Sequence, residues 1–337
     1  MAGARTPPKI TNAVKQRPRT RARSLLVKDE TRSFYVRAVR DAVTHVVANL
    51  DRALDLEQLA RKAALSPLHF HRIFRGMVGE TPLELHRRLR LERAAGQLRG
   101  SNTAVTTIAF SAGYDSHEAF TRAFRTFYGC SPSEFRQSRE LEQTDCSRPR
   151  QTEIAAKSGI HFAGDGAAEV PFQFIQGGTN MDVNIKQMKA LRVAVVHHVG
   201  AYSRISEAFG RLGDLAGRAS LLDAKPTMLA LYHDDPETTP ESELRSDAGI
   251  VVPENATLPA GLAERRLPAG RYACTMHIGP YEQLGDTWSR LMGQWLTGSA
   301  ERLAESPSFE IYLNTPADVP KAELRTELYM PLAPTTG

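Results

Sequence analysis

The chain has 337 residues, a length that predicts two or three domains. Of these residues 41% are hydrophobic and 24% are charged, a composition that is ordinary for a globular protein. The charge is unevenly divided, because residues 1–150 carry 27 Lys and Arg against 15 Asp and Glu, whereas residues 151–337 carry 16 against 23. A basic half joined to an acidic half predicts that only the first half meets a polyanion. No apolar run is long enough for a bilayer and no apolar stretch follows the basic N-terminus, so we expect a cytoplasmic protein with no membrane partner.

Neither a metal site nor a disulfide framework is visible in the sequence. Cys130, Cys146 and Cys274 are scattered without metal-ligand spacing, which favours a reduced chain. His197 and His198 are adjacent in a predicted strand and therefore point to opposite faces. We expect no metal and no cofactor.

The N-terminal half predicts a basic arm and then seven helices. Residues 1–30 are basic and poor in hydrophobic residues, so we expect a disordered arm, which is either a solvated tail or a contact for DNA phosphates. Thr31 can cap the first helix, whose apolar residues recur at helical spacing up to Leu50. The next three helices are predicted to begin at Asp55, Ser66 and Thr81, and the helix that begins at Thr81 ends near Arg99. The remaining three are predicted to cover about 105–113, 116–128 and 132–138.

One pattern occurs twice among these helices, with an offset of 49 residues before a turn and 50 after it. Each copy has small residues where two helices would approach closely, followed by an amphipathic helix, which is the pattern of a helix-turn-helix. The predicted reading helices, Pro67–Met77 and Ser116–Tyr128, are joined by the long helix that starts at Thr81. A monomer could therefore occupy two major-groove segments about 34 Å apart.

The faces opposite the apolar stripes of the two reading helices carry residue types that contact DNA. Arginine pairs with guanine, and Thr or His can contact base edges. Arg75 and Arg125 lie a turn further along their helices, which suits a phosphate contact better. The offset of 50 brings Arg72 into register with Arg122 and Arg75 with Arg125.

Residues 31–138 resemble the AraC/XylS-type DNA-binding domain, in which a long helix links two helix-turn-helix units. The second copy carries the signature of that family through Ile108-Ala109, Gly113-Tyr114, Phe120, Arg122, Phe124 and the pair Gly129 and Pro132. The resemblance implies base contacts from Leu68, His71, Arg72, His117, Glu118, Thr121 and Arg122. Because Leu68 and His71 differ from their counterparts Glu118 and Thr121, we expect an asymmetric pair of DNA boxes and not a palindrome.

The second half predicts a different fold after a linker. Residues 139–180 are polar and rich in Gly, Pro, Ser and Thr, with one short predicted strand at Phe172–Ile175. A strand through Val183 and Met188 is followed by a strand at Leu191–Val199 and a helix that ends near Ala219. Further strands are predicted at Met228–His233, Gly249–Val252, Arg271–Ile278, Phe309–Asn314 and Glu327–Met330.

This half also contains a repeat. His198-Val-Gly-Ala-Tyr202 matches His277-Ile-Gly-Pro-Tyr281 at an offset of 79, which also pairs Phe209 with Trp288. Each copy has the order strand, Gly turn, aromatic residue and helix. We therefore predict an α+β domain of two pseudo-symmetric strand–helix repeats, with a ligand cleft between them.

Residues 181–334 resemble the GyrI-like effector-binding domain, as in Rob-type regulators, through this repeat and through the segments 307–312 and 327–332. In the strand 309–313, Glu310 and Tyr312 share a face that would line the cleft. A buried carboxylate ringed by aromatic side chains attracts an organic cation, and the resemblance implies that role for Glu310. The candidate effector-binding residues are Glu310, Tyr312, Tyr202, Tyr232, Tyr281, Trp288 and Trp295, although Trp288 could equally be ordinary helix core.

These features predict a sequence-specific DNA-binding transcription regulator, more often an activator in this class, that is controlled by a small cationic or amphipathic effector. Its partners would be double-stranded DNA, the effector and RNA polymerase, and it would act as a monomer or a dimer. Fusion to a DNA-binding domain favours binding over catalysis, so we expect no enzyme. Two alternatives stay open: a regulator whose GyrI-like domain hydrolyses a small molecule with Glu310 as general base, and a constitutive DNA-binding protein with a vestigial second domain.

Overall fold

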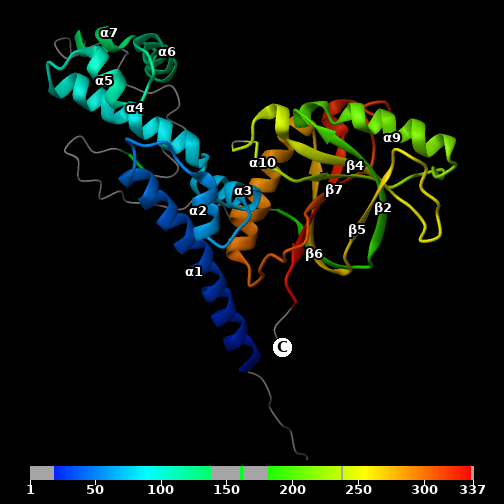
Figure 1. Cartoon of the computed structure of the whole chain (residues 1–337). Coiled ribbons are helices and arrows are strands. Elements are labelled where there is room, and N and C mark those ends of the chain that lie inside the picture. The colour runs from blue at the N-terminus through cyan, green and yellow to red at the C-terminus, as the bar shows by residue number, and fades with distance from the viewer. Residues whose placement is uncertain (1–18, 138–159, 162–180, 237, 335–337) are drawn as a thin grey trace, which may run out of the picture.

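The computed structural model describes residues 19–137, 160–161, 181–236 and 238–334, which form a helical N-terminal part and a C-terminal part built on one curled sheet (Figure 1). Within these residues no helix combines the length and the apolar character that a membrane span requires. The predicted arm over residues 1–18, nearly all of the predicted linker and the predicted strand at Phe172–Ile175 lie outside the described residues.

The helical part follows the predicted order of elements. Over residues 19–137 its helices are α1 (Arg19–Ala48), α2 (Leu56–Lys62), α3 (Pro67–Val78), α4 (Pro82–Gly100), α5 (Val105–Ser111), α6 (His117–Tyr128) and α7 (Pro132–Gln137). The structure differs from the expectation at one point, because α1 begins at Arg19 and residues 19–30 are helical. No Gly or Pro stands between Arg19 and Thr31 to end a helix, and Thr31 is buried inside α1 in place of capping it.

Repeated caps fix the ends of the two reading helices. Ser66 and Ser116 each accept a hydrogen bond from a backbone N–H three residues on, at 3.2 and 3.1 Å. Gly79 and Gly129 end α3 and α6 with φ of 91° and 81°, left-handed conformations that a side chain would strain. Thr81 starts α4 with a reciprocal capping box. These residues recur in the sequence because each repeat needs the same helix ends.

Two apolar clusters hold the helical part together, and α4 joins them. The first cluster packs α1 to α3 and the start of α4 around Phe70, Ile73 and Phe74. The second packs the end of α4 against α5 to α7 around Phe120 and Phe124. The predicted apolar stripes of both reading helices therefore face inward, and the opposite faces are left for other contacts.

The C-terminal part is built on an antiparallel sheet, which has eight strands over residues 183–332 in the order β1-β6-β8-β7-β3-β4-β2-β5. The strands are β1 (Val183–Met188), β2 (Leu191–Val199), β3 (Met228–Tyr232), β4 (Arg245–Val251), β5 (Ala263–Leu267), β6 (Gly270–Ile278), β7 (Phe309–Tyr312) and β8 (Arg325–Leu332). The first four and the last four strands of this order are related by the repeat, β1 with β5, β6 with β2, β8 with β4 and β7 with β3. The predicted pseudo-symmetry is confirmed.

Strand β5 has no counterpart among the predicted strands, because its sequence Ala-Glu-Arg-Arg-Leu is highly charged. It pairs with β2 at the edge of the sheet, where charged side chains protect an open strand from further pairing. Its counterpart in the repeat is β1, which begins 80 residues earlier at Val183. The repeat offset therefore locates β5, although its composition does not.

Two helices cover one face of the sheet, one from each repeat. These are α9 (Ser206–Arg218) and α10 (Leu284–Arg290), and α10 continues into a π-helical turn, η6 (Leu291–Leu296) (Figure 1). The other face is the inside of the curl and packs around Tyr272, Phe309 and Tyr329. The strand residues between α9 and α10 are thus free to line a cleft.

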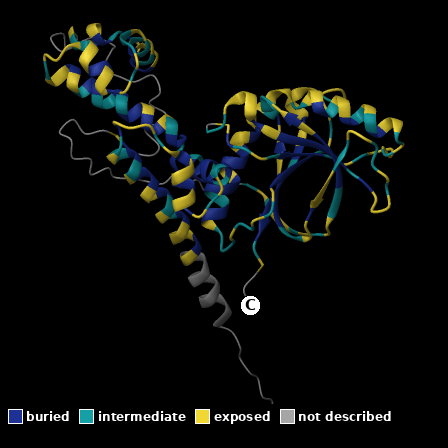
Figure 2. Ribbon diagram, viewed as in Figure 1, coloured by how far each residue is buried: buried dark blue, intermediate teal, exposed yellow. Residues whose placement is uncertain are grey.

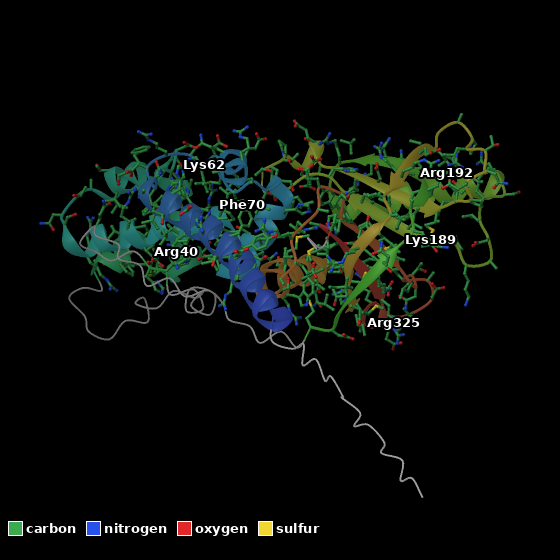
Figure 3. The ribbon with its side chains drawn as sticks, turned by 90° about the horizontal axis from the view of Figure 1, so that it is seen from below. Arg40, Lys62, Phe70, Lys189, Arg192 and Arg325 are labelled. Atoms are coloured by element: carbon green, nitrogen blue, oxygen red, sulfur yellow. The ribbon has the colours of Figure 1, made fainter. Side chains whose placement is uncertain are left out.

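The reading helix α3 packs directly against α10 and η6, so the two parts of the molecule share one apolar cluster. Gly76 of α3 and Gly293 of η6 meet backbone to backbone, and a Cβ on Gly293 would lie 2.4 Å from the Cα of Gly76. Figure 2 shows buried residues where these helices meet, and Figure 3 shows Phe70 of α3 in the helical part, with Lys189 and Arg192 in the sheet part. The face of α3 opposite its apolar stripe is therefore turned toward the C-terminal part.

Candidate effector cleft and DNA-reading helices

A buried carboxylate stands at the centre of the helix-covered sheet face. Glu310 is 2% exposed and pairs in the sheet with Ala230, its counterpart in the other repeat, so only one repeat supplies a charge here. The indole Nε1 of Trp288 donates a hydrogen bond to Glu310 Oε1 at 2.6 Å, and the Tyr312 hydroxyl donates to Oε2 at 2.9 Å. The Tyr232 and Tyr312 hydroxyls lie 3.2 Å apart. Because Tyr312 donates to Glu310, Tyr232 is the donor in that second hydrogen bond.

Burial is the largest influence on Glu310 and raises its pKa. The hydrogen bonds from Trp288 and Tyr312 and the positive charge of Arg72 lower the pKa, but they do not cancel the effect of burial. Burial and the nearby Glu310 charge raise the pKa of Tyr312 well above its ordinary value, so its hydroxyl remains a donor. The site is thus a carboxylate that water solvates poorly and that gains from a further positive charge.

A cavity of about 560 Å³ lies against Glu310, a size typical of small-molecule sites. Aromatic rings from both repeats form its walls, with ring centroids 4.8 Å apart for Tyr202 and Tyr232 and 5.3 Å apart for Tyr281 and Tyr312. The residues of the C-terminal part that line it include Tyr202, Ile205, Phe209, Met228, Tyr232, Tyr281, Leu284, Trp288, Glu310 and Tyr312. The structure therefore brings together every predicted effector residue except Trp295.

Trp295 lies on η6 and packs against the apolar cluster that the two parts share. In an α-helix it would return to the face of Trp288 seven positions earlier, but the wider π-helical turn rotates it away. Phe209 lines the cavity instead, with its ring centroid 5.6 Å from that of Tyr312. Phe209 was not a candidate, although the offset of 79 pairs it with Trp288.

In each repeat a histidine bonds the Gly turn that follows its strand. His198 and His277 each donate from Nε2 to a backbone carbonyl three residues on, at 3.1 Å in both repeats. His197 points to the other face of the sheet, as predicted, where it hydrogen-bonds Asp247. No three His, Cys, Asp or Glu side chains converge as metal ligands anywhere in the described part of the chain.

The second reading helix, α6, turns its predicted DNA face to solvent. Glu118, Arg122 and Arg125 are exposed, and His117 and Thr121 are half-buried. The apolar side of α6 is fully packed in the second cluster. An exposed helix face with two arginines, opposite a fixed apolar side, is able to enter a major groove.

The first reading helix, α3, turns its predicted DNA face to the effector cleft. Leu68, His71, Arg72 and Arg75 all line the cavity, and Leu68 and His71 are buried. The guanidinium carbon of Arg72 lies 4.3 Å from the centroid of the Trp288 ring, a cation–π contact. The predicted DNA contacts of α3 therefore remain predictions for a state in which this face is free.

A buried polar contact and an exposed ion pair flank the Arg72 contact. His71 Nδ1 lies 2.9 Å from an Asp235 carboxylate oxygen, with both side chains buried. Arg75 Nη2 lies 2.7 Å from Asp286 Oδ1, and both of these side chains are at least 40% exposed. The buried contact gives two buried polar side chains a partner, whereas the exposed ion pair contributes little to stability.

Two family models match the two halves of the chain separately. The family model described as GyrI-like small molecule binding domain matches residues 181–333, and that of a helix-turn-helix domain matches residues 59–138. The chain is 30% identical over 158 residues to the DNA gyrase inhibitor of Escherichia fergusonii, which covers 46% of this chain and 99% of that protein. It is 30% identical over 128 residues to the Transposon Tn10 TetD protein of Escherichia coli, covering 37% of this chain and 93% of that protein.

A third relative, the uncharacterized HTH-type transcriptional regulator YbfP of Bacillus subtilis, is 27% identical over 185 residues, which is 52% of this chain and 58% of that protein. Among solved structures, the EcmrR C-terminal domain is similar with a TM-score of 0.41, 20% identity, and coverage of 46% of this chain and 99% of that one. The EcmrR–DNA complex gives a TM-score of 0.40 at 22% identity and covers 45% of this chain and 57% of that one. The chain belongs to the AraC-type transcription regulators with a C-terminal GyrI-like domain, in which a DNA-binding half is joined to a small-molecule binding half.

Proposed function

We propose that the C-terminal cleft binds an organic cation and that this binding controls how the N-terminal half engages DNA. The observation that carries the proposal is Glu310, a carboxylate buried at the base of an aromatic cavity. Both of its hydrogen-bond donors, Trp288 and Tyr312, are neutral. The nearby charge of Arg72 does not cancel the effect of burial on Glu310, so a cation in the cavity would add a second positive charge and a cation–π contact of about 0.5–2 kcal/mol.

The DNA half supports reading of an asymmetric site. Arg122 and Arg125 are exposed on α6, and their counterparts Arg72 and Arg75 lie on α3 in the same helical positions. The other candidate readers differ between the helices, so the two boxes should differ in sequence. Activation of transcription through a contact with RNA polymerase is the regulatory output that we propose, by analogy with the AraC class.

Hydrolysis of a small molecule in the cleft is the second candidate, because the raised pKa of Glu310 is a property of general bases. The geometry favours binding, since each oxygen of Glu310 already accepts a hydrogen bond from a neighbouring side chain. Benzoylcholine, a cationic ester, separates the two functions. Binding without release of benzoate supports a receptor, and steady release that Glu310→Gln abolishes supports a hydrolase.

Calorimetric titration of the full chain tests the cation site. Benzyltrimethylammonium should bind, and neopentylbenzene, its neutral carbon isostere, should bind at least about tenfold more weakly. Both compounds have the same shape, but only the first carries the positive charge that Glu310 attracts. Glu310→Gln should remove this preference. Glu327→Gln is the matched control, since Glu327 is a partly buried carboxylate of the same sheet that pairs with Lys186 outside the cleft. Equal binding of the two compounds to the wild-type protein would contradict the proposal.

A further inference from the structure

We infer that Arg72 of the reading helix α3 is a tethered cation in the effector cleft, so that the first helix-turn-helix is held off DNA until a cationic effector displaces it. The inference rests on the proposed function of the cleft and adds the regulation of that site. It also means that the DNA-binding half supplies part of the cavity lining.

Arg72 stands where an organic cation would bind. Its guanidinium carbon lies 4.3 Å from the Trp288 ring centroid, and the same indole donates its N–H to Glu310. The ring therefore holds a positive group on its face and a carboxylate at its edge. An effector cation needs both partners, so it competes with Arg72 for one place.

The charges of Arg72 and Glu310 compensate each other incompletely. Burial lowers the pKa of Arg72 to about 10 although Glu310 and the neighbouring tyrosines act in the opposite direction, so the guanidinium stays charged at neutral pH. Glu310 keeps a raised pKa although Arg72 is near. An effector cation that lies closer to the carboxylate would compensate its charge more fully than Arg72 does. This difference favours replacement of Arg72 by the effector.

Docking on the cleft and reading of DNA use the same side chains. His71 is paired with Asp235 and Arg75 with Asp286, so the contacts predicted for bases and phosphates are made to two aspartates instead. Those aspartates would repel a phosphate backbone brought to the same face. The docked and the DNA-bound positions of α3 therefore exclude each other.

A glycine pair allows the close approach that brings Arg72 into the cleft. Gly76 follows Arg72 by one helical turn and lies against the backbone of Gly293, where a Cβ would approach the Cα and carbonyl carbon of Gly76 to 2.4 and 2.6 Å. Backbone atoms cannot move aside as a flexible side chain can. Gly293 lies outside both the cavity lining and the predicted DNA face, so it offers a way to undock α3 without touching either.

Footprinting of the full chain tests the docking. A DNA site is selected from random sequence with benzyltrimethylammonium present, and hydroxyl-radical protection is then mapped with and without the cation. Wild-type protein alone should protect one box, read by α6, and the cation should extend protection to the second box. Gly293→Ala should protect both boxes without the cation, whereas Gly213→Ala, where a Cβ on α9 meets nothing within 4 Å, should behave as wild type.

Two outcomes overturn the inference. In one, wild-type protein alone protects both boxes. In the other, Gly293→Ala binds the box read by α6 with wild-type affinity and still fails to protect the box read by α3. The α6 box thus reports that the variant is folded, and the α3 box reports the position of α3.

Calorimetry of Arg72→Met tests the competition independently. Removal of the tethered cation should strengthen benzyltrimethylammonium binding about tenfold, the ratio expected for a typical cation–π contact. Arg290→Met, an exposed arginine of α10 outside the cleft, should leave the affinity unchanged. If Arg72→Met binds the cation no more tightly than wild type, Arg72 does not compete for the site. That result contradicts the inference about Arg72 and leaves the proposed cation site standing. If the cation binds neither wild type nor Arg72→Met, the proposed cation site fails, and the Gly293→Ala footprint still decides whether α3 is held off DNA.

Discussion

Glu310 breaks the symmetry of the C-terminal half, since its partner across the pseudo-twofold axis is Ala230. Two carboxylates facing each other at this position would raise each other's pKa and one would stay protonated. A single carboxylate, held by Trp288 and Tyr312, suits a monocation and fixes which side of the cleft its charge occupies. The place of Glu310 on the cleft face was predictable from the sequence, because Glu310 and Tyr312 alternate with apolar residues along a strand.

Cation binding should depend on pH through Glu310. Burial raises the pKa of this carboxyl, and only its ionised form attracts a cation, so affinity should be full above that pKa and should fall by about tenfold per pH unit below it. The groups that influence Glu310 are Arg72 of α3, Trp288 of α10, His277 of β6 and Tyr312 of β7. Titrations of benzyltrimethylammonium between pH 4 and pH 8 should show this slope in wild type and a flat profile in Glu310→Gln. A slope that persists in the variant would assign the proton to another group.

Arg88 makes a buried ion pair that the sequence did not reveal, because Glu80 stands at a helix end where a solvated carboxylate is common. Arg88 Nη2 lies 2.6 Å from Glu80 Oε1, and the same guanidinium reaches Glu92 and the carbonyl of Ile160. Arg88→Met leaves Glu80 buried without its cation and should lower the free energy of unfolding by about 3–5 kcal/mol. Urea denaturation checks this value, and Arg88→Met with Glu80→Gln should lose clearly less. Equal losses would show that packing, not the charge, sets the cost.

At the scale of elements, local sequence signals located the helices but missed a strand that is specified by its pairing with a neighbouring strand. Ser66, Thr81 and Ser116 begin helices as predicted, because a side-chain cap acts within three residues. Strand β5 was missed because a charged edge strand is specified by its neighbour β2 and not by its own composition. The early start of α1 at Arg19 was missed because a possible cap at Thr31 does not by itself end the preceding helix.

The exposed face of α6 gives a prediction for the second reading helix. Arg122→Ala should cost about 1–3 kcal/mol of specific binding and should relax specificity within one box only, because its counterpart Arg72 serves the other. Arg218→Ala, an exposed arginine on α9, is the control for a change of net charge. Quantitative footprinting with benzyltrimethylammonium present, on a selected site and on single-base variants of each box, measures both effects. Uniform loss over both boxes would assign Arg122 to a phosphate instead of a base.

At the scale of the whole molecule, the sequence could not show where α3 would dock. A helix face with Leu68, His71, Arg72 and Arg75 suits the edge of a DNA groove, and it suits an acidic aromatic cleft equally well. The difference lies in Gly76, whose missing side chain lets the backbone of α3 approach η6, and nothing in the sequence marks this glycine as a contact. The shared apolar cluster joins the two parts, so a ligand in the C-terminal cleft can act on the N-terminal half.

That coupling is the central claim, and DNA affinity measured with and without a cation tests it directly. The full chain is titrated with its selected two-box DNA at increasing benzyltrimethylammonium, alongside Glu310→Gln. The structure predicts that the cation strengthens DNA binding by about 5–150-fold in wild type, and that by reciprocity DNA strengthens cation binding by the same factor, with neither effect in the variant. An unchanged DNA affinity in wild-type protein whose cleft is saturated with the cation would contradict the account.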